Sequence, residues 1–225
     1  MKSCRLWSLA ALAIYLPGCG DRPEQYVVPD QVTEFTALYE TNCAGCHGRD
    51  GRLGAARPLN DPAFLAVISK QTLRNVITNG VPQTSMPAFA QNSGGTLTEP
   101  QIAILVDQID ARWSRPGIFV GVTSPPYSAD PGDVKRGEAI FQKDCAGCHR
   151  EKGMGGSLVD PAFLALVSDQ SLRTTVIAGR SDRGMPDWRN HSHVMTPQEI
   201  SDVVAWLSSH RAVPFNLTKG GTNLP

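Results

Sequence analysis

The pentapeptide CAGCH occurs twice in this chain of 225 residues, as Cys43–His47 and as Cys145–His149. The two copies lie 102 residues apart and contain four of the six cysteines. A C-x-x-C-H run is typical of sites where two thiols add to the vinyl groups of haem and the adjacent histidine ligates the iron. Two copies predict two cofactor-centred units, because a domain of this size builds only a small hydrophobic core of its own.

The residues around the pentapeptide are repeated as well. With an offset of 99 residues, the segment 59–87 matches 158–186 at 14 of 29 positions, including DPAFLA and a Met-Pro pair. Each unit contains a short helix candidate, CAGCH, two middle helices, the Met-Pro pair and a closing helix. We therefore predict domains over 31–113 and 133–212. The segment 114–132, with four prolines and three glycines, is predicted to be a linker that runs over the surface.

Helix signals recur at matching positions and predict an all-α chain. An aspartate followed by proline, at Asp61 and at Asp160, is typical of an N-cap before the first helical residue. Thr98 with Gln101, and Thr196 with Glu199, fit capping boxes, and apolar residues then follow at helical spacing. Further helix starts and stops are expected at Ser69, Gly80, Ser168 and Gly179.

The N-terminus has the pattern of an export signal. Basic residues precede an apolar run at 6–16 that is too short to cross a bilayer. The run ends in Leu-Pro-Gly-Cys, which resembles a bacterial lipoprotein signal, with an ordinary secretory signal as the alternative. We expect residues 1–18 to be removed, Cys19 to be lipidated, and 19–30 to tether the protein to a membrane on its periplasmic side. Residues 213–225 are predicted to form a C-terminal tail.

Other uses of CAGCH fit the sequence less well. A thioredoxin-type redox pair needs no adjacent histidine, and a disulfide or a zinc site built from four cysteines leaves both histidines without a role. We therefore predict two covalently attached haem c groups, bound through the four cysteines Cys43, Cys46, Cys145 and Cys148. His47 and His149 are the predicted proximal iron ligands. With 21 basic and 21 acidic residues the chain has no charge excess that would favour nucleic acid as a partner.

A methionine is the predicted sixth ligand in each unit. Met86 is the only methionine of the first unit, and Met185 recurs before a proline in the second. A His/Met pair is the ligation typical of electron-carrying cytochromes. The second unit offers rivals, of which the histidines are the chief ones: Met154, Met195, His191 and His193.

Taken together, CAGCH, the downstream Met-Pro pair and the closing helix resemble class I c-type cytochrome domains, arranged in tandem as in dihaem cytochromes of bacterial electron-transfer chains. The resemblance implies a helical bundle around each haem. It has two departures. The first helix is weak and lacks the glycine that Gly137 supplies in the second unit, and a long polar tail follows Arg211. The closing helix carries Trp206 in the second unit and has no clear equivalent of it in the first.

The resemblance implies an electron relay rather than an enzyme. Expected partners are redox proteins such as a quinol-oxidising complex, a terminal oxidase or another cytochrome, with the membrane reached through the lipid anchor. The alternative is a dihaem oxidoreductase, peroxidase-like or thiosulfate-oxidising, that uses a labile ligand on the second haem. Arg74 and Arg173 recur in the middle helices, where each either pairs with a haem propionate or faces water.

Overall fold

The structure is a computed structural model, which describes residues 27–82 and 84–212. The predicted signal at 1–18, the lipidation site Cys19 and the tail at 213–225 lie outside the described residues. Within the described part, the secondary structure is helical and no strand forms, apart from two isolated bridges. No helix in that part is long and apolar enough to cross a membrane. The all-α prediction is confirmed.

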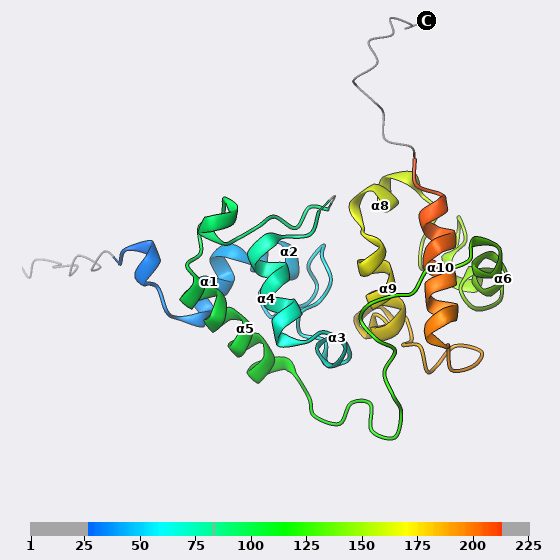
Figure 1. Cartoon of the computed structure of the whole chain (residues 1–225), viewed down its shortest axis with the longest axis horizontal. Helices are drawn as coiled ribbons and strands as arrows, with labels where there is room; N and C mark the ends of the chain where they lie inside the picture. The colour runs from blue at the N-terminus through cyan, green and yellow to red at the C-terminus, as the bar shows by residue number, and fades with distance from the viewer. Residues whose placement is uncertain (1–26, 83, 213–225) are drawn as a thin grey trace, which may run out of the picture.

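Figure 1 shows two helical halves side by side along the long axis of the molecule. The described helices of the first half are η1 (Pro29–Gln31), α1 (Phe35–Asn42), α2 (Ala44–His47), α3 (Pro62–Val67), α4 (Lys70–Asn79), η2 (Gln91–Ser93) and α5 (Glu99–Trp113). Those of the second half are α6 (Val134–Asp144), α7 (Ala146–His149), α8 (Pro161–Leu166), α9 (Asp169–Ala178), η3 (Ser181–Arg183) and α10 (Pro197–Ser209). The α-helices follow one another in the same order in both halves, and η1 has no counterpart in the second.

The repeated cap residues explain why these helices begin where they do. The Asp61 carboxylate accepts hydrogen bonds from the backbone amides of Ala63 and Phe64, and Asp160 caps α8 in the same way. Ser69 and Ser168 cap α4 and α9, and both predicted capping boxes, at α5 and α10, are present. Side-chain oxygens thus satisfy amides that the first helical turn leaves without partners.

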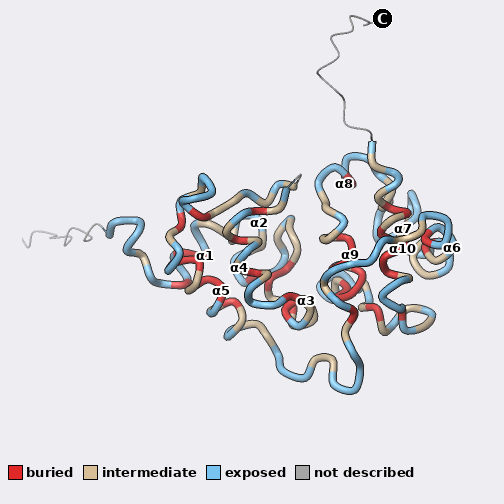
Figure 2. The backbone as a smooth tube through the Cα atoms, in the orientation of Figure 1, coloured by how far each residue is buried: buried red, intermediate tan, exposed pale blue. Residues whose placement is uncertain are grey.

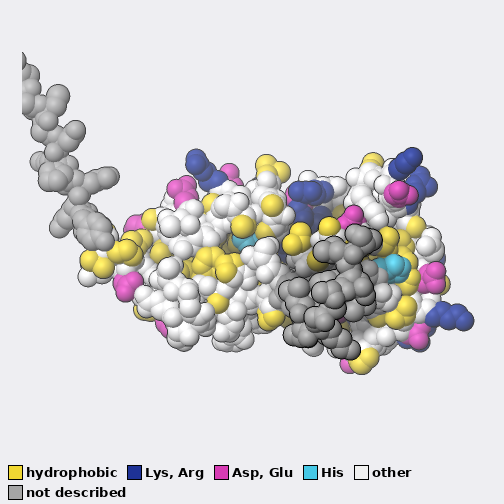
Figure 3. Space-filling view, turned by 90° about the horizontal axis from the view of Figure 1, so that it is seen from above, with side chains coloured by type: hydrophobic (Ala, Val, Ile, Leu, Met, Phe, Trp, Pro, Cys, Tyr) yellow, Lys and Arg dark blue, Asp and Glu magenta, His cyan; other side chains and the backbone are white. Residues whose placement is uncertain are grey.

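There are two hydrophobic cores, one centred in each half, and Ala178 at the end of α9 belongs to the first; buried residues are marked in Figure 2. The closing helices α5 and α10 supply much of both cores, since Ile102, Leu105 and Ile109 are completely buried and Ile200 is as well. On the face shown in Figure 3, basic and acidic side chains are interspersed, as the equal totals of the two kinds suggest.

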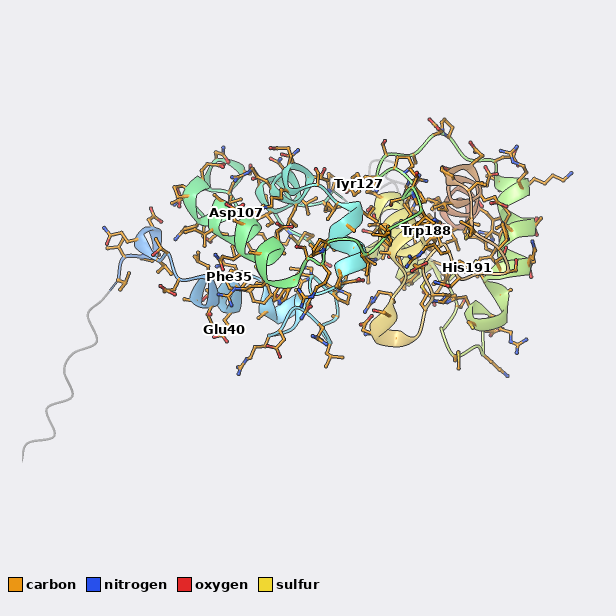
Figure 4. The ribbon with its side chains drawn as sticks, turned by 90° about the horizontal axis from the view of Figure 1, so that it is seen from below. Phe35, Glu40, Asp107, Tyr127, Trp188 and His191 are labelled. Atoms are coloured by element: carbon orange, nitrogen blue, oxygen red, sulfur yellow. The ribbon has the colours of Figure 1, made fainter. Side chains whose placement is uncertain are left out.

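The closing helices pack differently in the two halves. Gly137 in α6 lies against the backbone of α10, and the Trp206 ring packs 4.3 Å, centroid to centroid, from Phe141. In the first half the residue at the position of Gly137 is Phe35, and α1 is only eight residues long. Trp113, at the end of α5, packs against both Phe35 and Tyr39 (Phe35 is labelled in Figure 4). The prediction that the first half lacks a counterpart of Trp206 was wrong, because Trp113 fills that role from another position.

The two halves touch through α3 and α9, which face each other at the centre of Figure 1. The predicted linker runs from α5 around the outside, but it is fastened to the second half along its length. Phe119 packs edge-on against Trp188 at 4.5 Å between ring centroids, and Gln170 donates a hydrogen bond to the Tyr127 carbonyl at 2.9 Å (Figure 4). The linker is therefore part of the packed structure rather than a free tether.

Candidate haem-attachment sites

Both CAGCH copies form a single helical turn, α2 and α7, that continues directly from the preceding helix. The four thiols are free. In each copy the first cysteine is half-buried and the second is exposed. One thiol of each pair thus faces inward and the other lies at the surface, where a planar group attached to both would have one edge near solvent.

The buried thiols are poor redox nucleophiles. Burial, with a smaller contribution from the neighbouring thiol, raises the pKa of Cys43 to about 12. Burial likewise raises the pKa of Cys145 to about 12, helped by the charge of Asp144. A reactive redox pair requires the opposite shift, because the thiolate is the reacting form. The first cysteine of each pair therefore lacks the lowered pKa that a redox-active thiol requires.

Each histidine ring is oriented by a backbone carbonyl. Nδ1 of His47 lies 2.7 Å from the Arg57 carbonyl oxygen, and Nδ1 of His149 lies 3.3 Å from that of Gly156. A carbonyl can only accept, so Nδ1 carries the proton and Nε2 keeps its lone pair for a metal. Burial also lowers the pKa of His47, which favours the neutral ring that a metal ligand requires.

Small residues and one tyrosine shape the loops beside these histidines. A Cβ on Gly155 would lie 2.6 Å from Cε1 of His149, so only glycine fits against that ring. In the first half, the Tyr39 hydroxyl donates a hydrogen bond of 3.0 Å to the carbonyl of Gly48, the residue after His47. The loop beside each histidine is thus fixed by contacts with neighbouring residues of the same half.

The Met-Pro segments, which we call the methionine straps (81–82 with 84–88, and 180–187), fold back onto the helices before them. Gly80 and Gly179 end α4 and α9 with φ of +68° and +69°, and a Cβ on either would come within 2.8 Å of strap backbone. In the second strap, Arg180 and Met185 exchange two backbone hydrogen bonds of 3.0 Å. In the first strap the Val81 amide donates to the Met86 carbonyl at 3.0 Å, so the methionine carbonyl accepts a backbone hydrogen bond within each strap.

The rivals to Met185 occupy different surroundings. Met154 is 94% exposed, and Met195 is buried in the second core. His193 places Nε2 2.8 Å from the Glu199 carboxylate, which already belongs to the capping box of α10. His191, labelled in Figure 4, is half-buried, and its Nε2 has no hydrogen-bond partner among the described residues. His191 is therefore the main alternative to Met185 as the sixth ligand of the second site.

The two repeated arginines are engaged by protein groups. Arg74, which is half-buried, pairs with the exposed Glu99 at 3.7 Å. Arg173 is 2% exposed and donates to the Pro126 carbonyl, at 3.0 and 3.1 Å, and to the Ser201 hydroxyl at 3.0 Å. This position matches neither of the two expectations for Arg173, which were a propionate partner or an exposed side chain. Arg173 instead holds the linker against α9 and α10 through these hydrogen bonds.

Sequence reasoning missed Arg57. With the 99-residue offset it corresponds to Gly156, so both residues that accept the histidine Nδ1 proton occupy the same repeat position. The only sequence signal for Arg57 was that this repeat position holds an arginine in the first unit and a glycine in the second. The Arg57 side chain crosses to the second half, where it contacts Thr175 and Gly179.

These features fit haem c. Each half combines two free thiols on one helical turn, an imidazole whose Nδ1 faces a backbone carbonyl, glycine positions that leave no room for a side chain, and a downstream methionine. Among the described residues there is no group of three or more histidine, cysteine, aspartate or glutamate side chains that could hold a metal ion. His47 and His149 would hold the iron and the four cysteines the porphyrin.

Comparison with known proteins gives an independent result. The family described as cytochrome C oxidase, cbb3-type, subunit III matches residues 30–107 and 132–207, more than half of the chain. A cytochrome bc1 complex cytochrome c subunit of Corynebacterium diphtheriae is 25% identical over 239 residues, covering 95% of this chain and 82% of that protein. The corresponding protein of Mycobacterium tuberculosis is 25% identical over 178 residues, covering 76% and 60%.

A subunit of a cbb3-type cytochrome c oxidase from Azospirillum is 30% identical over 131 residues, which cover 53% of this chain and 39% of that subunit. Among solved structures, a chain of a Kuenenia stuttgartiensis reducing HAO-like protein complex aligns with a TM-score of 0.49 at 18% identity, covering 83% of this chain and all of that one.

Proposed function

Because the chain belongs to the cytochrome C oxidase, cbb3-type, subunit III family, and is thus an electron-transfer cytochrome with covalently bound haem c, we propose that it is a membrane-anchored dihaem relay. It passes single electrons between redox partners on the periplasmic side. Two domains, 31–113 and 133–212, each hold one haem between a histidine and a methionine. The lipid on Cys19 and the segment 19–30 keep the relay at the membrane.

One observation carries the proposal of two equivalent sites. In both halves a carbonyl at the same repeat position accepts the Nδ1 proton of the CAGCH histidine, which leaves both Nε2 atoms available. Bound iron porphyrin supplies a one-electron ferric/ferrous couple. The chain's own contribution is to fix the imidazoles, to present Met86 and Met185 on tight straps, and to leave one edge of each site near the surface cysteine.

The partners follow from the relatives. Those that match are named as subunits of bc1 complexes and of cbb3-type oxidases, which are respiratory assemblies. We propose a quinol-oxidising complex as the electron donor and a terminal oxidase or another cytochrome as the acceptor. Co-purification of the full chain from detergent-solubilised membranes tests this. A Cys19→Ser variant should appear in the soluble fraction, with its absorption spectrum unchanged.

The ligands are tested by absorption spectra during a redox titration. Met86→Ala and Met185→Ala should each remove the long-wavelength sulfur-to-iron band from one haem and lower its reduction potential. His191→Ala should change neither quantity. If His191→Ala rather than Met185→Ala alters the second haem, the methionine assignment there is wrong. Carbon monoxide binding to one haem of the unmodified protein would mean that this haem has an open or labile ligand position. That result would favour the enzymatic alternative over the relay.

A further inference from the structure

The two halves differ at the residue whose carbonyl orients the proximal histidine. In the second half this residue is Gly156, which has no side chain. In the first half it is Arg57, whose carbonyl oxygen lies 2.7 Å from Nδ1 of His47. The peptide therefore performs the same task in both copies, and the arginine side chain is an addition confined to one of them.

The Arg57 guanidinium is buried at the boundary between the halves. Its side chain is 16% exposed and stacks on Phe64, with Cζ 4.6 Å from the ring centroid. It donates hydrogen bonds to the Thr175 hydroxyl at 3.0 Å and to the Gly179 carbonyl at 3.3 Å. The guanidinium thus reaches from the proximal side of the first site to the helix end on which the second methionine strap folds.

Gly179, whose carbonyl accepts a hydrogen bond from Arg57, also lies against the strap that carries Met185. Gly179 is so close to the strap that a Cβ on it would lie 2.7 Å from the Met185 carbonyl oxygen. A cavity of about 390 Å³ at the same boundary is lined by Asp61 and Ala63 from the first half and by Met185 and Pro186 from the second. The strap of the second site therefore faces the helix that Asp61 caps, next to the guanidinium.

The charges around Arg57 are few. Asp61 is its carboxylate partner, with an oxygen 3.4 Å from Nη2. The other nearby ions, Arg180 and Asp182, pair with each other at 2.9 Å. Burial lowers the pKa of Arg57 to about 10, which leaves the guanidinium charged at neutral pH, and Asp61 only partly offsets that charge at this separation.

We propose that Arg57 is a potential-setting residue: its buried cation raises the reduction potentials of both haems, because it lies between the imidazole of His47 and the strap of Met185. The inference rests on the proposed dihaem function. Ferric haem carries one more positive charge than ferrous haem, so a nearby buried cation disfavours the oxidised state. Asp61 acts in the opposite direction and moderates the effect.

The test is a redox titration of the haem-loaded full chain, followed by absorbance, on four variants. Arg57→Met removes the charge but keeps the carbonyl that orients His47, and both midpoint potentials should fall. Asp61→Asn keeps a residue able to cap α3, removes the opposing charge, and should raise both potentials. Arg57→Lys keeps the charge and loses the guanidinium contacts, and should stay near the wild-type values. Lys70→Met, which removes an exposed cation paired with Asp107, should change nothing.

A purely structural role predicts another pattern. If Arg57 only joined the two halves, Arg57→Met and Arg57→Lys would shift the potentials alike, and Asp61→Asn would shift them in the same direction. That result, or no shift in any variant, overturns the inference. Haem content and the sulfur-to-iron band of the wild type are measured first. A wild type that lacks a second haem or either band contradicts the proposed function instead, so the two failures are distinguishable.

Discussion

Gly137 lies so close to Asp202 that a Cβ on the glycine would stand 1.9 Å from the Asp202 carbonyl oxygen. The first and last helices of the second half cross at this point, and no other residue type fits there. Phe35 occupies the matching position of the first half, where α1 is shorter and Trp113 packs against the ring. One duplicated fold thus brings its first and last helices together by two different means.

Replacing this glycine should destabilise the second half. Alanine has a higher helix propensity than glycine, so a loss of stability in Gly137→Ala must come from the steric clash of the added Cβ. We expect a loss of about 1–3 kcal/mol in the free energy of unfolding, typical of overpacking a close contact. Urea unfolding followed by circular dichroism measures it, with Glu138→Ala on the exposed neighbouring position as the control. An unchanged or increased stability would show that the helices do not cross so closely.

Asp202 should make the second half sensitive to acid. The carboxylate is 1% exposed; burial acts to raise its pKa, but hydrogen bonds from Arg136, the Asp133 amide and Gln198 lower it below the ordinary value. A lowered pKa in the folded state stabilises the protein above the unfolded-state pKa, near 4, and that contribution is lost as the pH falls further.

The comparison variant is Asp202→Asn. At pH 7 the wild type should exceed it by about 2 kcal/mol in the free energy of unfolding, because charge-assisted hydrogen bonds are lost. The difference should shrink below about pH 4. Unfolding titrations at a series of pH values measure it, and a difference that stays constant down to pH 2 would mean that Asp202 is not an ionised partner of Arg136.

The Tyr39 hydroxyl should stabilise the loop that follows His47. The side chain is 2% exposed, and its hydroxyl donates to the Gly48 carbonyl. Tyr39→Phe should cost about 1 kcal/mol, typical of one lost hydrogen bond. Tyr39→Leu, which also removes the edge-on contact with Trp113, should cost more. Equal losses in both variants, measured by thermal unfolding, would count against a role for the hydroxyl.

The repeated arginines provide a matched pair. Arg173→Met removes the buried clamp on the Pro126 carbonyl and should cost about 1–3 kcal/mol, because the carbonyls it serves lose their donor. It should also speed proteolytic cleavage within 114–132. Arg74→Met, at the equivalent position of the first half, removes one surface ion pair and should have little effect on either measurement. Similar cleavage rates for the two variants would show that Arg173 does not hold the linker.

Much of the fold could be predicted from local signals. Asp61, Ser69 and Thr98 act on amides two or three residues away, so their roles are visible in the sequence itself, and the duplication provides a second instance of each. Trp113 and Arg57 were missed because their partners are distant: Trp113 contacts a helix about 75 residues earlier, and Arg57 contacts Thr175 in the other half.

Arg173 is another residue whose role could not be predicted from the sequence. Its recurrence with Arg74 suggested a shared role, yet the structure gives the two residues different partners: Arg173 donates to the Pro126 carbonyl of the linker, and Arg74 pairs with Glu99. A repeat therefore predicted well what each unit needs to fold alone. The repeat did not predict the contacts between the two units, because those contacts are not duplicated.

The most direct test of the relay is intact-mass spectrometry of the mature protein from a host that matures c-type cytochromes. We predict a mass that corresponds to two covalently attached haems, falling to one haem in Cys43→Ala/Cys46→Ala and likewise in Cys145→Ala/Cys148→Ala. A wild-type chain that carries one haem or none, while remaining folded, would contradict the proposal that both pentapeptides are haem sites.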